Sequence, residues 1–474
     1  MRIIGRKHEI NEIARCVSSP RPEFIALYGR RRIGKTYLIR EYFNQQFAFY
    51  ATGVTEEITS GQLRAFNESL KEYGCAEKSA PKDWYEAFSR VKELLNNPNV
   101  RREPVNNKRV IFLDELPWMD TPRSDFKSAL DYFWNSWGSA QADLLLIVCG
   151  SATSWIIDNL LYGKKGFHNR VTCRIRMLPF SLKECKELFI HNGLNLPDTQ
   201  IIDSYMVFGG IPFYLNMLDP KLSVVQNINE LCFKEYGALY DEYHILFHSL
   251  FRKPEKHMAI MKRISSRKSG MTRTELASDR AIGGGAALTK DLRELEQCGF
   301  IRKYNNYSKQ KNEAFFQLID PFAAFYLNFM SENSDLRSWT EYVNTPGYNS
   351  WRGNAFEMTV LNHVEQIKKV LGISGIESRE YAWRSRISDQ GVQIDLLIDR
   401  RDGVINLCEA KYSNAAYEIS AEEYEKIERR MSVFQNETGT EKSIHITLIT
   451  ANGLAKNKYS DIALNTVSGE ELFE

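Results

Sequence analysis

The residues best suited to phosphate chemistry lie in residues 24–40, FIALYGRRRIGKTYLIR. An apolar run leads into a GxxxxGKT loop and a helical pattern follows, which is the context that a phosphate-cradling loop requires. Gly29 and Gly34 let backbone N–H groups point at phosphate oxygens, and the helix adds its positive amino-terminal dipole. We expect Lys35 to contact the β and γ phosphates and the Thr36 hydroxyl to hold Mg²⁺. A glycine turn in an ordinary strand–helix unit is the alternative.

Two later segments are expected to lie beside this loop. Residues 109–115, RVIFLDE, form an apolar run before two carboxylates, as buried parallel strands do. At the end of such a strand Asp114 would orient Mg²⁺ through a water molecule, and Glu115 would polarise the water that attacks the γ phosphate. Ser151 follows a third strand, residues 144–149. It would either touch the γ phosphate or the attacking water, or serve as a turn or cap residue.

ATP with Mg²⁺ is therefore the expected cofactor. Thr36 and Asp114 are the expected metal ligands at this site. The residues expected to bind the nucleotide are Gly29, Arg30, Arg31, Arg32, Ile33, Gly34, Lys35, Thr36, Asp114 and Ser151.

The first half of the chain resembles the archaeal-type ATPases, which belong to the broad AAA+ and STAND group of P-loop proteins. The segments that carry the resemblance, in family order, are residues 3–13, 29–36, 109–115, 168–184 (HNRVTCRIRMLPFSLKE) and 209–215 (GGIPFYL). The resemblance implies that Gly5 and Arg6 lie near the adenine pocket, that Arg170 senses the γ phosphate, and that Pro212 belongs to a helical lid. An arginine ahead of the alternating VTCRIRML pattern is otherwise a solvated edge residue.

Length and composition indicate several ordinary globular domains. A chain of 474 residues with 43% hydrophobic content is expected to form two to four domains with normal cores. No apolar run approaches the roughly 20 residues needed to cross a bilayer, and no secretory signal follows Met1. We therefore expect a cytoplasmic protein without a membrane partner. The eight cysteines form no CxxC pair, so we expect reduced thiols and no zinc site.

Residues 252–312 form a basic segment with 15 Lys or Arg against 6 Asp or Glu, an excess of nine (15 − 6). Such a bias is typical of a nucleic-acid surface. The pattern predicts a winged helix with helices at 257–267, 272–277 and 286–297 and a hairpin around the turn 305–312. Lys290, Arg293, Arg302 and the lysines of the wing would then contact DNA phosphates. A protein-interaction surface with a solvated charged face is the alternative.

A polar stretch, residues 331–350, is suited to a linker, and a helix is expected from Trp351. Beyond it, GVQIDLLIDRRDGVINLCEAKYS predicts two strands joined by an Arg-Asp-Gly turn. Alternation places Asp395, Leu397 and Asp399 on one face of the first strand, and Glu409 with Lys411 on one face of the second.

Two carboxylates and a lysine can therefore converge. Half-buried carboxylates are costly unless they are paired or bind a cation, and with phosphate oxygens and water they form a Mg²⁺ site. Lys411 would orient a nucleophilic water or stabilise charge at phosphorus.

This arrangement resembles the PD-(D/E)xK nuclease superfamily, in which an acid on a helix precedes an Asp and a Glu-x-Lys on adjacent strands. GNAFE, residues 353–357, and the ATPase part narrow the likeness to the DUF234-type domain often fused to archaeal ATPases. The resemblance implies that Asp395 and Glu409 hold Mg²⁺ or Mn²⁺, that Lys411 activates water, and that Glu357 completes the metal shell. The proline of the superfamily name is absent.

Three interpretations of this motif stay open: an active nuclease, a nuclease fold that binds DNA without cleaving it, and a chance surface ion pair. We expect an α/β protein that comprises a P-loop ATPase sheet with a helical lid, a winged helix, and a restriction-endonuclease-like domain. The expected boundaries are 1–180, 181–250, 251–330, a linker at 331–350, and 351–474. The expected function is ATP-gated DNA binding with metal-dependent cleavage. The competing function is a non-cleaving switch that binds DNA or a protein, and assembly into a homo-oligomer is open in both cases.

Overall fold

A computed structural model describes residues 3–162, 169–251, 253–307, 314–331, 338–343, 345–385 and 391–474. His168 and part of the expected wing, residues 308–312, lie outside the described residues. The chain divides into two compact units, Met1–Leu178 and Pro179–Glu474, and each is described by itself. The finer division into an ATPase core, lid, winged helix, linker and nuclease-like domain stays a prediction.

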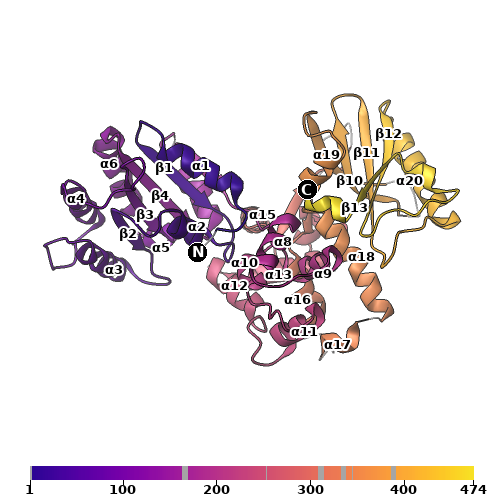
Figure 1. The fold of residues 1–474 in the computed structure, drawn as a ribbon, viewed down its shortest axis with the longest axis horizontal. Helices are drawn as coiled ribbons and strands as arrows, with labels where there is room; N and C mark the ends of the chain where they lie inside the picture. Colours follow the sequence, from indigo (N-terminus) through magenta and orange to yellow (C-terminus); the bar gives the residue numbers. More distant parts are fainter. Residues whose placement is uncertain are drawn as a thin grey trace. The chain divides into compact units, whose positions relative to one another are not determined.

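The first unit is built on a parallel sheet with the strand order β2-β3-β4-β1-β5 (Figure 1). Its elements are α1 (Lys7–Val17), β1 (Glu23–Tyr28), α2 (Lys35–Tyr42), β2 (Phe49–Thr52), α3 (Thr59–Glu72), α4 (Trp84–Leu95), β3 (Arg109–Asp114), α5 (Leu116–Met119), α6 (Phe126–Ser136), η1 (Gly138–Ala140), β4 (Leu144–Gly150), α7 (Thr153–Trp155), η2 (Ile156–Leu161) and β5 (Cys173–Arg176).

The central strands are buried on both faces, as their apolar runs predict. Every residue of β3 and β4 is buried. On one face the aromatic side chains Phe66, Trp84 and Phe126 of α3, α4 and α6 join Phe24 of β1 in a single core. The helix α1 contacts β1 and β5, and Cys16 of α1 meets Cys173 of β5. Helices thus cover both faces, which leaves the strand ends as the place for polar chemistry.

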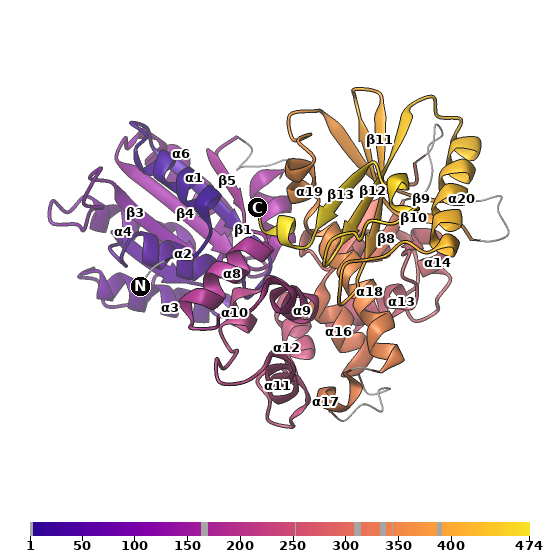
Figure 2. The ribbon, with the colours of Figure 1, turned by 45° about the vertical axis from the view of Figure 1, so that its right-hand side comes forward.

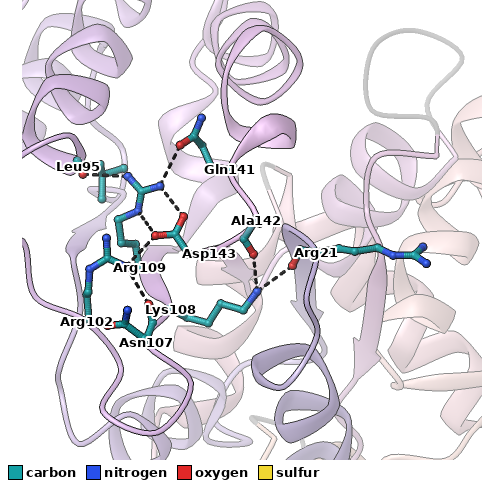
Figure 3. Close-up of polar contacts among 9 residues, drawn as sticks. All are labelled: Arg21, Leu95, Arg102, Asn107, Lys108, Arg109, Gln141, Ala142 and Asp143. Carbon is teal, nitrogen blue, oxygen red and sulfur yellow. Dashed lines mark hydrogen bonds and ion pairs between the residues drawn. The ribbon is translucent and has the colours of Figure 1, made fainter.

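Polar contacts fix the amino end of β3, as Figure 3 shows. The Arg109 guanidinium donates to Leu95 O at 2.9 Å and forms an ion pair with Asp143 at 2.6 Å. Arg102 donates to the same carboxylate at 2.7 Å, and Lys108 Nζ donates to Arg21 O at 2.8 Å and to Ala142 O at 2.7 Å. Burial tends to raise the pKa of Asp143, but the two guanidinium groups outweigh it and lower that pKa. These contacts set the position from which β3 runs to its carboxyl end.

The second unit contains a helical part, a small antiparallel sheet and a mixed five-stranded sheet. Its elements are α8 (Leu182–His191), α9 (Asp198–Phe208), α10 (Pro212–Leu215), α11 (Val224–Ile228), η3 (Asn229–Phe233), α12 (Glu242–Leu250), α13 (Pro254–Ser265), β6 (Met271–Thr272), α14 (Arg273–Ala277), α15 (Gly285–Gln297), β7 (Ile301–Tyr304), β8 (Phe315–Leu318), α16 (Pro321–Phe329), α17 (Trp339–Tyr342), α18 (Pro346–Leu361), α19 (Val364–Val370), β9 (Ser378–Arg384), β10 (Gln393–Arg400), β11 (Val404–Lys411), α20 (Ala421–Thr438), β12 (Ser443–Thr450), η4 (Ser460–Ile462), β13 (Asn465–Ser468) and η5 (Glu470–Phe473).

The basic segment folds as three helices, α13 to α15, with the small sheet β6-β8-β7. Thr272 caps α14 in a capping box with Glu275, as the sequence spacing predicts. Leu288, Leu292 and Leu295 of α15 are buried at helical spacing. The three helices and the two strands that follow them come in the expected order, whereas β6, which pairs with β8, was not expected. The identity of this segment as a winged helix stays a prediction.

The C-terminal sheet has the order β13-β12-β11-β10-β9, with α20 between β11 and β12 in the chain (Figure 2). β10 and β11 are antiparallel, as predicted, whereas β11 pairs with β12 in parallel. Ile427 and Phe434 of α20 pack with Ile394 and Leu397 of β10 in one core cluster.

The strict alternation expected along β10 is wrong. Its pairing with β9 shifts register between Ile394 and Leu397, and both of these side chains enter the same core cluster. Such a bulge re-aims the side chains within it, and bulges are common beside functional sites. Asp399, which was expected beside Asp395, instead pairs with Lys442 at 2.6 Å.

The expected linker contains helical structure. The Thr345 side chain accepts from the Tyr348 N–H and Pro346 occupies the first turn, so α18 begins before the expected start at Trp351. Trp339 of α17 is 1% exposed and packs on the rings of Phe325 and Phe329. This aromatic packing is non-local, and a polar local sequence did not reveal it.

A buried polar cluster joins three parts of the second unit. Asp203 of α9 accepts a hydrogen bond from Tyr412 Oη at 2.8 Å and pairs with Arg352 Nη2 of α18 at 3.3 Å. The Arg352 guanidinium lies 4.0 Å from the centre of the Tyr412 ring and donates to Asn414 at 2.7 Å.

Among the helices within the described ranges, none is long and apolar enough to cross a membrane.

Candidate functional site

The glycine-rich loop follows β1, and its glycines are required by geometry. A Cβ on Gly29 would lie 2.3 Å from Met177 O, and its φ of +149° is a conformation that other residues rarely adopt. Gly34 has a φ of +86° and ends the loop at the first turn of α2. The register pairs Tyr28 with Gly150, so the carboxyl ends of β1 and β4 meet at one edge.

Lys35 is a buried cation without a carboxylate partner among the described residues. Lys35 is 6% exposed. Its Nζ donates to Gly29 O and Arg30 O, each at 2.9 Å. A buried ammonium normally pairs with an anion, and here the carbonyls of the loop take that place. The donor set fits an anionic phosphate.

Thr36 and Asp114 lie together as a metal–nucleotide site requires. Thr36 Oγ1 donates to Asp114 Oδ2 at 2.8 Å. Burial raises the pKa of Asp114, the charge of Glu115 adds to this, and the Thr36 hydrogen bond opposes it. A hydroxyl beside a buried carboxylate suits Mg²⁺, which takes oxygen ligands.

Glu115 stands directly after β3 in a left-handed conformation, with φ 46°. Its Oε2 accepts from Ser151 Oγ at 2.8 Å and from the Ser151 N–H at 3.1 Å. Ser151 therefore contacts the expected catalytic carboxylate, a contact that neither sequence alternative for this serine included. A Cβ on Gly150 would lie 2.5 Å from Pro117 Cδ, which shows how closely the chain packs here.

Arg170 is not brought to the loop. It is exposed and precedes β5, at the edge where the Thr172 N–H bonds to Phe24 O near the start of β1. The 6 residues of β1 at about 3.3 Å each put the loop on the order of 20 Å away, beyond the reach of an arginine in the same chain. Arg176 instead pairs in register with Tyr28, the residue before the loop. The sequence analysis did not single out Arg176, because the family resemblance pointed to Arg170.

Arg6 has a structural role in the loop. Its guanidinium donates to Ile33 O at 2.9 Å and to Leu178 O at 2.7 Å. It adopts a left-handed conformation just before α1, with φ 58°. It thus ties the amino terminus to the loop; the adenine-pocket role implied for Gly5 and Arg6 stays a prediction.

In the second unit the expected nuclease residues meet at one cavity. A cavity of about 510 Å³ is lined by Glu357 of α18, Asp395 of β10, and Glu409 and Lys411 of β11. Four residues from three separate elements thus converge, which the surface ion-pair alternative does not require. We call this the acidic cavity after its three carboxylates, although basic side chains also line it.

Ion pairs inside the acidic cavity determine its charge states. Lys411 Nζ lies 2.9 Å from Glu409 and 2.7 Å from Glu423, and Arg430 lies 2.6 Å from Glu409. Burial favours neutral Glu409, but Lys411 and Arg430 outweigh it and lower its pKa. Burial likewise opposes the charge on Lys411, but the two glutamates outweigh it and raise its pKa. Both groups are therefore held charged.

Glu357 has a different environment. Burial is the main cause that raises its pKa to about 7, with a further contribution from the negative charge of Asp395, while its ion pair with Lys268 acts in the opposite direction. Asp395 accepts a hydrogen bond from Gln393 Nε2. The negative charges of Glu357 and Asp395 repel each other in a partly desolvated cavity, and a bound cation would relieve that repulsion. Glu357, Asp395 and Glu409 supply the carboxylate oxygens that a divalent metal takes as ligands, but they are not among the described groups whose ligand atoms all lie within 4.8 Å of one another.

Arg302, expected on the DNA-facing surface, takes a different place. Its Nη2 donates to Asp395 O at 3.0 Å and its Nε donates to Gln317 at 2.7 Å. Burial lowers the pKa of Arg302, though nearby Tyr304 and Asp395 oppose this. The residue connects the basic segment to the acidic cavity, a non-local contact that its position in the sequence does not indicate.

A second group of potential metal ligands was not predicted. His257, Asp291 and Glu294 place one ligand atom each within 4.8 Å of one another. His257 Nε2 lies 3.0 Å from Glu294, and Lys256 pairs with Asp291 at 2.8 Å. Because a lysine already neutralises one of the acids, this group is adequately explained as an ion-pair network.

Residues 3–218 match a family described as an ATPase domain predominantly from Archaea. An uncharacterized protein of Methanocaldococcus jannaschii is 23% identical over 339 residues, 70% of this chain and 69% of its own. A Walker-type ATPase of Pyrococcus abyssi is 18% identical with a TM-score of 0.49, over 69% of this chain and 96% of its own. The Aeropyrum pernix ORC2 protein, solved as ADPNP and ADP complexes, is 13% identical with a TM-score of 0.42, over 69% and 93%. The family match shows an ATPase domain of the archaeal type.

Proposed function

We propose that the archaeal-type ATPase domain binds and hydrolyses ATP at residues 29–36, and that the acidic cavity cleaves phosphodiester bonds of DNA with a divalent cation. The observation that carries the second part is the convergence of Glu357, Asp395, Glu409 and Lys411 on one cavity. If the D…ExK pattern were a coincidence, there would be no reason for Glu357, on the separate helix α18, to line the same cavity as the three residues of that pattern.

The nucleotide site supports hydrolysis through its residue contacts. Lys35 would exchange the carbonyls of the loop for phosphate oxygens. Mg²⁺, held by Thr36 and Asp114, would neutralise the phosphate charge. Glu115, fixed by its two hydrogen bonds from Ser151, would orient the attacking water.

The acidic cavity supports hydrolysis of a phosphodiester. A divalent cation held by Glu357, Asp395 and Glu409 would lower the pKa of a bound water and shield the scissile phosphate. Lys411 is held protonated by two glutamates, so it would donate a hydrogen bond to the oxygen where charge develops and would not remove the proton of the water. The water oxygen would bond to phosphorus as the bond from phosphorus to the ester oxygen breaks, with the water proton released to solvent and a solvent proton taken up by the departing oxygen.

DNA binding by the basic segment is the third part of the proposal. Among its described residues, 12 Lys or Arg stand against 6 Asp or Glu, an excess of six (12 − 6), on α13 to α15, the small sheet and the loops between them. Lys290 on α15 is exposed, which suits a phosphate contact. Affinity that is dominated by such contacts should fall steeply as salt rises.

The decisive experiment incubates plasmid with ATP and Mg²⁺ or Mn²⁺. We expect the wild type to nick or linearise DNA, and Asp395→Ala to lose at least about 100-fold of that rate, because one metal ligand is removed. Asp399→Ala is the matched control on the same strand, since its side chain pairs with Lys442 outside the acidic cavity. Cleavage by Asp395→Ala at the wild-type rate would show that the assigned site is wrong.

The competing function is a switch that binds DNA or a protein and cleaves nothing. The ion pairs of Lys411 and Arg430 with Glu409 favour it, because they partly satisfy the cavity without a metal. A wild type that hydrolyses ATP and leaves DNA intact under every metal condition would establish the switch.

A further inference from the structure

The lining of the acidic cavity carries more positive than negative charge. Five cations, Lys268, Lys411, Lys426, Arg429 and Arg430, accompany three carboxylates. Lys411 and Arg430 pair with Glu409, Lys268 pairs with Glu357 and Lys426 pairs with Glu422, which leaves Arg429 as the one of these five cations without a carboxylate partner within the described ranges. A cavity whose lining carries more cations than carboxylates, beside a proposed metal site, is electrostatically suited to a polyanion.

Lys268 reaches the cavity from the basic segment. Its backbone O accepts from Gln317 Nε2 at 2.8 Å, and Gly270 nearby adopts a φ of +72° with its Cβ position 2.5 Å from Phe316 O. The loop is thus held against β8, while the lysine side chain, 44% exposed, forms an ion pair with Glu357. Arg302 adds a second contact between the basic segment and the cavity. One segment therefore contributes to both the expected DNA surface and the expected cleavage site.

Arg429 reaches the cavity from α20. Its side chain is exposed, and within the described ranges it forms no hydrogen bond or ion pair with the protein. Lys426 lies three residues earlier, on the same side of the helix, where it pairs with Glu422 at 2.6 Å. A guanidinium that has no carboxylate partner beside a cavity is free to bind a phosphate with two parallel hydrogen bonds.

We propose that Lys268 and Arg429 bind two phosphates of a DNA backbone that crosses the mouth of the acidic cavity. The substrate is then a polynucleotide strand and not a mononucleotide, because cations from two separate elements contact phosphates outside the cleaved one. Glu357 would be a ligand of the divalent cation, so Lys268 would then be released from its ion pair with Glu357 to contact a phosphate. The inference rests on the proposed function for the identity of the polymer.

The test measures binding without cleavage, using full-length protein, a short fluorescein-labelled duplex and Ca²⁺ in place of Mg²⁺. Fluorescence anisotropy gives the dissociation constant over a series of salt concentrations. Each phosphate contact contributes about 0.9 to the slope of log K against log salt. We expect Lys268→Gln and Arg429→Gln each to reduce the slope by about 1, and the double variant by about 2.

Lys456→Gln is the matched control, because Lys456 is an exposed lysine of the same C-terminal part and does not line the cavity. Melting curves confirm that each variant is folded. Slopes of Lys268→Gln and Arg429→Gln that equal those of the wild type and of Lys456→Gln overturn the inference, as does a wild type that binds no DNA.

The design separates this inference from the cleavage proposal. If the wild type cleaves nothing and the two slopes still fall, the phosphate contacts are established and the nuclease assignment fails. If the wild type cleaves and Asp395→Ala does not, while the slopes are unchanged, the nuclease assignment is established and the phosphate contacts are wrong.

Discussion

At the scale of single residues, Ser151 holds the Glu115 carboxylate with two hydrogen bonds. Ser151→Ala removes the 2.8 Å hydroxyl contact but keeps the backbone N–H contact at 3.1 Å. We expect ATP hydrolysis to fall about tenfold with little change in KM, because the carboxylate is less well oriented. Glu115→Gln should cost far more, about 100-fold or more, while ATP still binds. Steady-state phosphate release measures both; a Ser151→Ala enzyme with wild-type kcat would assign the serine to packing alone.

Arg176 and Arg170 provide a paired prediction. Arg176 pairs with Tyr28 at the loop end of β5, and Arg170 precedes the other end. Arg176→Ala should weaken ATP binding several-fold, since it removes a cation near the phosphates, and Arg170→Ala should leave ATP binding by the single chain unchanged. Titration with a fluorescent ATP analogue distinguishes them. The reverse order of effects would contradict the placement of β5.

Local sequence was sufficient for some of these residues and insufficient for others. The loop from Gly29 to Thr36 is contiguous, so the spacing alone identifies it. The partners Ser151 of Glu115 and Lys268 of Glu357 come from other parts of the chain. No local pattern encodes such contacts. The shifted register beside Asp395 was also beyond prediction, because it depends on pairing with β9.

At the scale of elements, Gly210 joins the segment before α8 to the start of α10. A Cβ there would lie 1.8 Å from Phe180 O, whose own N–H donates to Gly210 O. Gly210→Ala must displace backbone, so we expect a loss of about 3 kcal/mol. Gly193→Ala is the control: it has a φ of +81° and nothing within 4 Å of the Cβ position, so only about 1 kcal/mol of backbone strain is expected. Thermal unfolding compares the two, and equal losses would contradict the close approach.

His363 connects α18 and α8 and makes their packing sensitive to acid. Its Nε2 accepts from the Leu182 N–H at 3.0 Å and its Nδ1 donates to Thr359 O at 2.8 Å. Burial lowers the pKa of His363 to about 4 from an ordinary 6.5, with the Thr359 hydrogen bond opposing. The folded state therefore binds fewer protons than the unfolded state in this range. The stabilisation is complete above pH 6.5 and is lost as pH falls toward 4, by up to about 3 kcal/mol.

Unfolding of wild type and His363→Leu between pH 7 and pH 4 tests this dependence. We expect the variant to lose less stability with acid than the wild type, because it has no buried imidazole to protonate. His191→Gln is the control, because His191 is an exposed histidine at the end of α8, the helix whose Leu182 N–H donates to His363. Parallel pH curves for wild type and His363→Leu would rule out the imidazole as the cause.

Elements with strong local signals were predicted and those formed by distant packing were not. β1, β3 and β4 are apolar runs buried on both faces, and α14 carries its own capping box, so periodicity and caps identify them. α17 is a short helix held by aromatic rings from other elements. Its residues look like linker because the stabilising contacts lie outside the window that a local pattern covers.

At the scale of the whole molecule, the two proposed chemistries lie in different units and should be separable. Lys35→Ala should abolish ATP hydrolysis and any effect of ATP on DNA, and retain the cleavage seen without nucleotide. Asp395→Ala should retain ATP hydrolysis. Parallel assays of phosphate release and plasmid cleavage, with and without ATP, measure all four rates. Loss of both activities in either variant, with the protein folded, would mean that the two sites do not work independently.

The Asp203 carboxylate has a mechanical consequence for the proposed nuclease. Tyr412, whose hydroxyl it holds, follows Lys411 directly in the chain, and Arg352 completes the attachment from α18, five residues before Glu357. A rotation of α9 would therefore displace the main chain at Lys411 and tilt α18, which carries the proposed metal ligand Glu357. A ligand that turned α9 would thus change the alignment of the proposed cleavage residues without contacting the substrate.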